Sequence, residues 1–133
     1  MDSRIIDLSK YRFEKGLEDF DTAKSNIEVG KYRQAVNRSY YAVFHAMRAV
    51  TALDEFDSSK HSGIKAYFNH NYVKEGFFDK SISKMIESLY VMRENADYQD
   101  FFVVTKSQAE EQIEIAEKVI DMIKIHLEQR WSQ

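Results

Sequence analysis

The sequence contains no cysteine, no proline and only four glycines among its 133 residues. Without cysteine the chain can form no disulfide, and it has neither a thiolate nucleophile nor a cysteine-ligated zinc site. A β-sandwich needs turn residues about every 8–12 positions, whereas long helices do not. The scarcity of turn-forming residues therefore favours an all-helical chain.

Long apolar runs and a strong charge of one sign are also missing. No run approaches the roughly 20 apolar residues that cross a bilayer, and residues 1–10 are mixed and charged, unlike a signal peptide. We therefore expect a cytoplasmic protein with no membrane partner. The net charge of −3 argues against a protein that coats nucleic acid with its whole surface, but it allows a local basic groove. The length suits a single domain over residues 1–133.

Apolar residues at spacings of three and four predict five helices, over about residues 8–28, 32–53, 58–71, 79–96 and 105–127. Ser58 or Ser59 could cap the third helix, and Asp79 the fourth. Thr105 and Gln108 form a capping box before the fifth. Residues 98–104 are aromatic without a helical period, so we expect a loop lying on the bundle. Short connections predict an up-and-down bundle of four long helices plus a shorter fifth.

Polar residues suited to chemistry are densest in the second predicted helix. Arg38 and His45 are seven positions apart, so they share one face about 10 Å apart along the axis and should not touch. Tyr41 lies between them. This strip is either a site for a phosphate or a base, or a buried hydrogen-bond network that orients helices. Spacing alone favours the network.

Two smaller clusters also have two interpretations each. Arg93 and Asp97 are four positions apart, so they can form a structural ion pair, or Arg93 can use its planar fork on a phosphate. His61, at the start of the third helix, is either structural or part of a site. The sequence has no glycine-rich phosphate loop, no Glu-x-x-His pair and no metal-ligand spacing among its histidines. We therefore expect no metal and no cofactor.

Three stretches of the sequence resemble the HEPN family, in particular its small stand-alone prokaryotic members. They are residues 30–32 (Gly-Lys-Tyr) with 35–46 (Ala-Val-Asn-Arg-Ser-Tyr-Tyr-Ala-Val-Phe-His-Ala), residues 60–63 (Lys-His-Ser-Gly) with 72–76 (Tyr-Val-Lys-Glu-Gly), and residues 93–98 (Arg-Glu-Asn-Ala-Asp-Tyr). The resemblance implies a five-helix bundle that forms a homodimer. It also implies pairing with a minimal nucleotidyltransferase, as the toxin half of a toxin–antitoxin pair. Many HEPN domains are metal-independent ribonucleases.

The usual ribonuclease motif of the family is an arginine, four to six residues, and then a histidine late in the bundle. Arg93 stands where the arginine is expected, but Asp97 and Tyr98 follow it and no histidine does. Arg38 and His45 match the spacing on the second helix instead. A metal-independent ribonuclease needs an acid and a base near neutral pH and a cation on the phosphate. The departure therefore bears on catalysis more than on the fold.

We predict a homodimeric protein that binds RNA or a nucleotide and serves as the toxin of a nucleotidyltransferase–HEPN pair, with metal-independent ribonuclease activity. The predicted catalytic residues are His45, Arg93 and Asp97. The predicted RNA or nucleotide contacts are Arg38, Tyr41, Lys60, His61 and Tyr98. The alternative is a non-catalytic dimeric interaction module that pairs with the nucleotidyltransferase.

Overall fold

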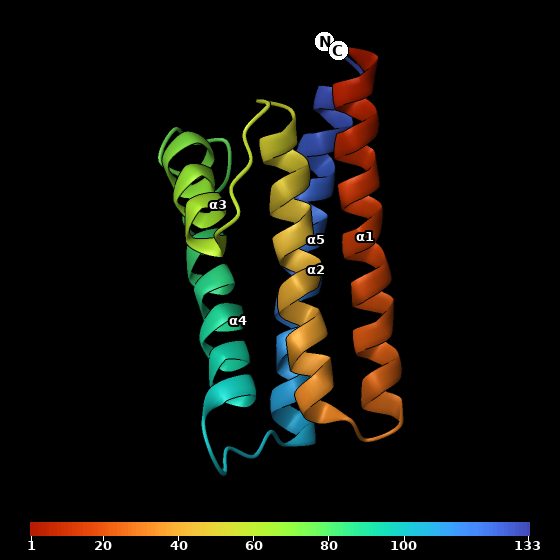
Figure 1. Cartoon of the computed structure of the whole chain (residues 1–133), viewed down its shortest axis with the longest axis vertical. Coiled ribbons are helices and arrows are strands. Elements are labelled where there is room, and N and C mark those ends of the chain that lie inside the picture. Colours follow the sequence, from red (N-terminus) through yellow and green to blue (C-terminus); the bar gives the residue numbers. More distant parts are fainter.

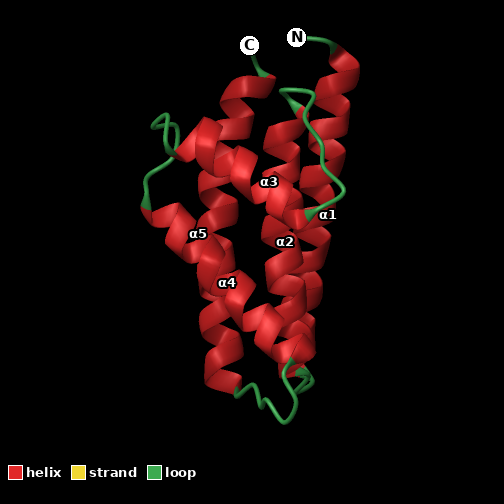
Figure 2. Cartoon of the chain, turned by 60° about the vertical axis from the view of Figure 1, so that its left-hand side comes forward, coloured by secondary structure: helices red, strands yellow, loops and turns green.

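The computed structural model describes all 133 residues and contains helices but no strands (Figures 1 and 2). The elements are α1 (Ser3–Glu28), α2 (Tyr32–Ala52), α3 (His61–Phe68), the π-helical turn η1 (Asn69–Val73), α4 (Ser81–Tyr98) and α5 (Lys106–Trp131). Helix α2 is central, because it packs against α1, α3, α4 and α5. The predicted all-α bundle, with four long helices and a shorter one, is confirmed. None of its helices could cross a membrane.

The helix ends differ from the predicted ones where local hydrogen bonds decide them. Helix α1 begins at Ser3 because the Asp2 carboxylate accepts the backbone N–H of Arg4. Neither Ser58 nor Ser59 is the residue before α3; that residue is Lys60, and Ser58 Oγ accepts its N–H. The third helix does not run unbroken to residue 71, since it changes to the π-helical turn after Phe68. Helix α4 continues two residues past Ala96, to Tyr98.

The capping box predicted at the start of α5 is formed in both directions, between Thr105 and Gln108. Asp79 accepts the backbone N–H of Ser81, but the residue before α4 is Lys80 and not Asp79. These bonds satisfy N–H groups that have no partner inside the helices.

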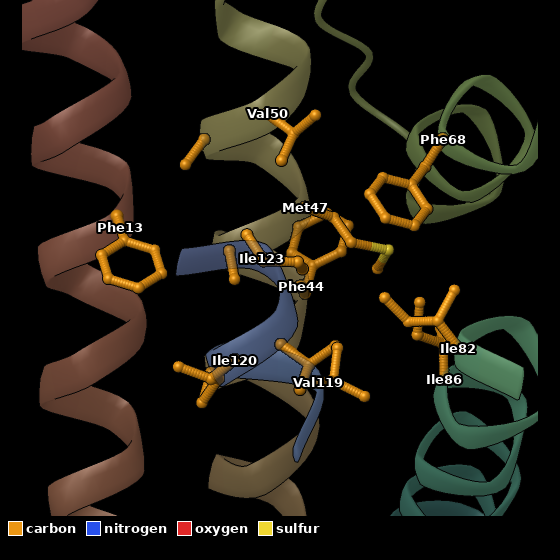
Figure 3. Close-up of a cluster of buried hydrophobic side chains, with 14 of the residues drawn as sticks. Phe13, Phe44, Met47, Val50, Phe68, Ile82, Ile86, Val119, Ile120 and Ile123 are labelled. Carbon is orange, nitrogen blue, oxygen red and sulfur yellow. The ribbon is translucent and has the colours of Figure 1, made fainter. Parts of the chain in front are cut away.

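The main core fills the space between α2 and the helices around it. Figure 3 shows Met47 and Phe44 of α2 among side chains from α1, α3, α4 and α5, including Phe13 and Phe68. Helices α1 and α2 approach very closely at Gly16, where an added Cβ would lie 2.7 Å from the Ala42 carbonyl oxygen. This close approach brings the following turn of α1 against the polar side of α2.

A second, smaller cluster holds the connection between α4 and α5. It comprises buried residues of α2, α4, α5 and the connection, with Phe102 packed against them: Ala35, Val36, Ala96, Val104 and Ala109. The loop lies on the bundle as predicted, but only in alternate residues. Phe101 and Val103 point outward, and Phe101 has a left-handed backbone with φ of 62°. For a residue with a side chain that conformation costs about 1–2 kcal/mol.

Candidate functional site

The candidate site lies along one polar stripe of α2. Its members recur at spacings of three and four, so they share one face of the helix: Gln34, Arg38, Tyr41, His45 and Arg48. The buried residues of α2 occupy its other faces. Helix α1 flanks α2 on one side, and α3 with α4 flank it on the other, as Figure 1 shows. Side chains from three further helices can therefore reach the stripe.

Tyr41 stands at the centre of this stripe, between two guanidinium groups. The guanidinium of Arg38 lies 5.0 Å from the centre of the Tyr41 ring, and that of Arg93 lies 5.1 Å from it. Nη2 of Arg93 also donates a hydrogen bond of 2.7 Å to the Tyr41 hydroxyl. The structure thus brings together Arg38 and Tyr41 of α2 with Arg93 of α4.

Arg93 is buried, with 8% of its surface exposed; its two terminal nitrogens donate hydrogen bonds inside the chain, and its Nε is near a carboxylate without donating a hydrogen bond. Nη1 lies 2.7 Å from the Glu94 carboxylate, and Nε lies 3.0 Å from that of Asp97. Burial opposes its charge, but Tyr41, Tyr98 and the two carboxylates outweigh that effect and raise the pKa of Arg93. The predicted Arg93–Asp97 pair is therefore present, within a larger set of contacts that fixes the guanidinium in place.

Asp97 extends this set back to α2 through Asn37. Asn37 Nδ2 donates to the Asp97 carboxylate over 2.9 Å, and Asn37 Oδ1 accepts from Nε and Nη2 of Arg38 over 2.9 and 2.6 Å. A chain of polar contacts therefore runs from Arg93 to Arg38. Sequence reasoning missed the role of Asn37, although its place beside Arg38 was the available signal.

His45 is tied to Arg38 through Asp19 of α1. One oxygen of Asp19 lies 3.0 Å from Nη1 of Arg38, and the other lies 3.5 Å from Nε2 of His45. The two α2 residues are thus bridged across the spacing that was predicted to separate them. The other nitrogen of His45, Nδ1, is buried without a partner. Burial lowers the pKa of His45, and Asp19 offsets this only in part, which favours the neutral ring.

His61, the first residue of α3, is presented more openly. Its Nδ1 lies 3.2 Å from the Tyr40 hydroxyl, and its ring packs on Phe44 with centroids 4.0 Å apart. Its Nε2 has no partner in the chain and is not enclosed. Burial, and then the charge of Arg93, lower the pKa of His61. The ring of Tyr41 is 5.5 Å away, so His61 belongs to the same cluster.

Two grooves open along the stripe, one on each side of Tyr41. The His61 groove, about 510 Å³, is lined by Phe44, Arg48, Asp57, Ser58, Ser59 and His61. The Arg38 groove, about 440 Å³, has no apolar residue in its lining, which is Thr22, Asn26, Lys31, Arg33, Gln34, Asn37, Arg38 and Asp97. No group of three histidine, aspartate or glutamate side chains is placed to hold a metal ion.

The comparison with known families agrees with the bundle and with the sequence around α2. The HEPN domain matches residues 9–126 of the chain. The chain belongs to the HEPN family. A Methanocaldococcus jannaschii protein named as a candidate toxin, MJ0605, is 35% identical over 107 residues, which cover 80% of this chain and 79% of that protein. A Thermotoga maritima protein named only UPF0332 is 30% identical and covers 86% of this chain and 87% of its own length.

A solved structure supports the fold of this HEPN protein. The protein TT1696 from Thermus thermophilus superposes with a TM-score of 0.74 over 87% of this chain and 95% of that one. At 15% identity the likeness concerns the fold alone.

In this HEPN chain no histidine follows Arg93 on α4. His61 of α3 nevertheless lies within the same cluster, joined to Arg93 through Tyr40 and Tyr41. Lys60, next to it, is exposed and forms no ion pair, and Tyr98 is 68% exposed.

The histidines make the stability of this HEPN domain depend on pH. Burial lowers the folded-state pKa of His45, His61 and His126. As pH falls, the unfolded chain therefore binds protons before the folded one does, and stability that is fully present above about pH 6.5 is lost below it. We expect the melting temperature to fall between about pH 7.5 and pH 5.5, by less in His126→Leu. A melting temperature that rose on acidification would contradict this.

Proposed function

We propose that this HEPN protein binds single-stranded RNA along the polar stripe of α2 and cleaves it without a metal ion. The observation that carries the proposal is the position of Tyr41, between the guanidinium groups of Arg38 and Arg93 and 5.5 Å from the ring of His61. An aromatic ring, cations and a histidine with a free nitrogen are the groups that recognise and cleave RNA.

The grooves on either side of Tyr41 suit the two parts of a nucleotide. Arg38 keeps 36% of its side chain exposed at the mouth of its groove, and Lys60 is free beside the other groove. Both can meet phosphates. Tyr98, which is 68% exposed, offers ring surface for a base, whereas Phe44 is buried. Arg93 is too enclosed to be the first phosphate contact, so its role is to orient Tyr41 and Asp97 and to add positive potential.

His61 fits the acid–base task better than His45 in this arrangement. In cleavage without a metal, a base takes the proton of a ribose 2′-hydroxyl, whose oxygen attacks the neighbouring phosphorus. The bond from phosphorus to the next nucleotide then breaks, its oxygen takes up a proton, and a cyclic phosphate remains. His61 lines its groove and has Nδ1 held by Tyr40, whereas the free nitrogen of His45 is buried. Asp19 and His45 then hold Arg38.

The proposal includes two partners. A second copy of this chain would complete the site, as the family resemblance implies, and a minimal nucleotidyltransferase would act as the antitoxin. Two of the relatives in Methanocaldococcus jannaschii, MJ0605 and MJ0142, are named as candidate toxins. A toxin that acts on cellular RNA would work in the cytoplasm.

One observation favours the alternative, a non-catalytic dimeric module that pairs with a nucleotidyltransferase. Both terminal nitrogens of Arg93 donate to groups of the same chain, and the free nitrogen of His45 is buried. On this alternative the network only orients α1, α2 and α4. RNA binding separates the two functions, because the module has no need of it.

The binding test uses a short fluorescent strand of 2′-O-methyl RNA, which cannot be cleaved through its 2′ oxygen. Arg38→Gln is expected to weaken binding about tenfold at low salt and to reduce the slope of log affinity against log salt by about one, because one phosphate contact is lost. Fluorescence anisotropy at several salt concentrations measures both. Lys84→Gln, an exposed cation on α4, is the matched control. Equal losses in both variants would show general charge attraction instead of a groove.

A further inference from the structure

The connection between α4 and α5 displays an aromatic side chain entirely in solvent. Phe101 has a relative exposure of 101%, and its backbone is left-handed, with φ of 62°. A large apolar side chain gains nothing from burial there, and the left-handed region disfavours any residue with a Cβ. The fold therefore gains nothing from an aromatic side chain at this position. Such a pair of violations at one position indicates a role in contact with something else.

The exposure of Phe101 is imposed by the residues on either side of it. Phe102 packs against the second core cluster, and Val104 is a buried member of it. Nη2 of Arg33 donates a hydrogen bond of 2.9 Å to the Phe102 carbonyl. Alternate residues therefore anchor the loop to α2, and Phe101 is turned away from the bundle by that anchoring.

Two cations without a carboxylate partner, Lys31 and Arg33, lie beside this loop. A shallow groove of about 330 Å³ runs between the loop and the start of α2, and it shares Lys31, Arg33 and Gln34 with the Arg38 groove. Lys31 and Arg33 are exposed and take part in none of the ion pairs of the chain. Asp97 is already engaged by Arg93, which leaves Asp100 as the unpaired carboxylate near Phe101.

We propose that Phe101 is a stacking platform for one base of a single RNA strand, whose phosphates pass over Lys31 and Arg33 as it leaves the Arg38 groove. The inference rests on the proposed function, and it adds a second contact outside the cleavage site. Cations along a groove, with a protruding ring on the loop that borders it, are a combination that binds single strands with little regard to sequence. The free cations match a polyanion, which is why RNA and not a protein is the proposed occupant.

The test measures the affinity and salt dependence of the same 2′-O-methyl strand for Phe101→Asn. Loss of stacking is expected to weaken binding about tenfold and to leave the salt slope unchanged, because no charge is removed. Lys31→Gln should instead reduce the slope by about one. Phe101→Trp keeps a ring and should keep the affinity. Val103→Ser is the matched control, since it removes a 74% exposed apolar side chain without a ring from the same loop.

Partial unfolding of a variant cannot explain a loss of RNA affinity in Phe101→Asn alone. Asparagine tolerates the left-handed conformation better than phenylalanine, so Phe101→Asn should melt no lower than the wild type. If the wild type binds the strand and Phe101→Asn binds it equally well, the stacking platform is wrong and the proposed function stands. If the wild type binds no strand, the proposed function itself fails. If the Phe101 and Val103 variants instead lose self-association in light scattering and keep their RNA affinity, the loop contacts protein and the inference is overturned.

Discussion

His61→Ala is expected to reduce cleavage of a mixed RNA pool in EDTA by about 10²- to 10⁴-fold, the usual contribution of a general acid or base. The reason is geometric, because His61 lines its groove and has one ring nitrogen held by Tyr40. Gel analysis of the products, with a check for cyclic phosphate ends, measures the rate and the chemistry. His70→Ala, which removes an exposed histidine of η1, is the control and should cleave normally.

The same cleavage experiment distinguishes the role of His61 from that of His45. His45→Ala should lower cleavage less, because His45 touches Asp19 and acts by holding Arg38. Its effect should appear mainly as weaker RNA binding, and Asp19→Asn should reproduce it. If His45→Ala abolished cleavage while binding was kept, His45 would be the acid–base group, as the sequence predicted. If no folded protein cleaved RNA, the interaction module would be the better description.

The sequence predicted the elements well because each helix carries its own apolar period. The stripe in α5 and its capping box are local patterns that tertiary contacts reinforce. The exact starts of α1 and α3 depend on single hydrogen bonds to Asp2 and Ser58, which compete with equally plausible neighbours. The π-helical turn after α3 left no recognisable signal. The apolar period therefore predicts the helices, and single local hydrogen bonds set their exact starts.

The site was predictable only where its contacts lie within one helix. The pair Arg93–Asp97 and the shared face of Arg38 and His45 follow from helical spacing alone. The bridge through Asp19 joins α1 to α2, and its cause is the close approach of the two helices at Gly16. No spacing in the sequence encodes such a crossing. The contact of His61 with Tyr40 could not be predicted from spacing either, since it depends on how α3 packs against α2.

Tyr98→His is expected to raise metal-independent cleavage by up to about 100-fold, because an added acid–base group typically contributes that much or more. The substitution restores the family pattern of an arginine, four residues and a histidine on one helix. Tyr98 is 68% exposed, and the Arg93 guanidinium lies 5.4 Å from its ring, so an imidazole there would be both accessible and near the fixed cation. Initial rates on the mixed RNA pool in EDTA measure the gain, and Tyr98→Phe serves as the control.

The double variant Tyr98→His with His61→Ala shows where the chemistry takes place. If activity returns in the double variant, a histidine on α4 can replace the one on α3, and both must reach the same phosphate beside Arg93. That result would mean that this chain has kept the cation of the motif and moved the acid–base group to another helix. If Tyr98→His brings no gain while His61→Ala removes activity, the reacting phosphate lies on the α3 side of Tyr41, beyond the reach of residue 98. No cleavage by either would leave Arg93 as a structural cation that orients Tyr41 for binding alone.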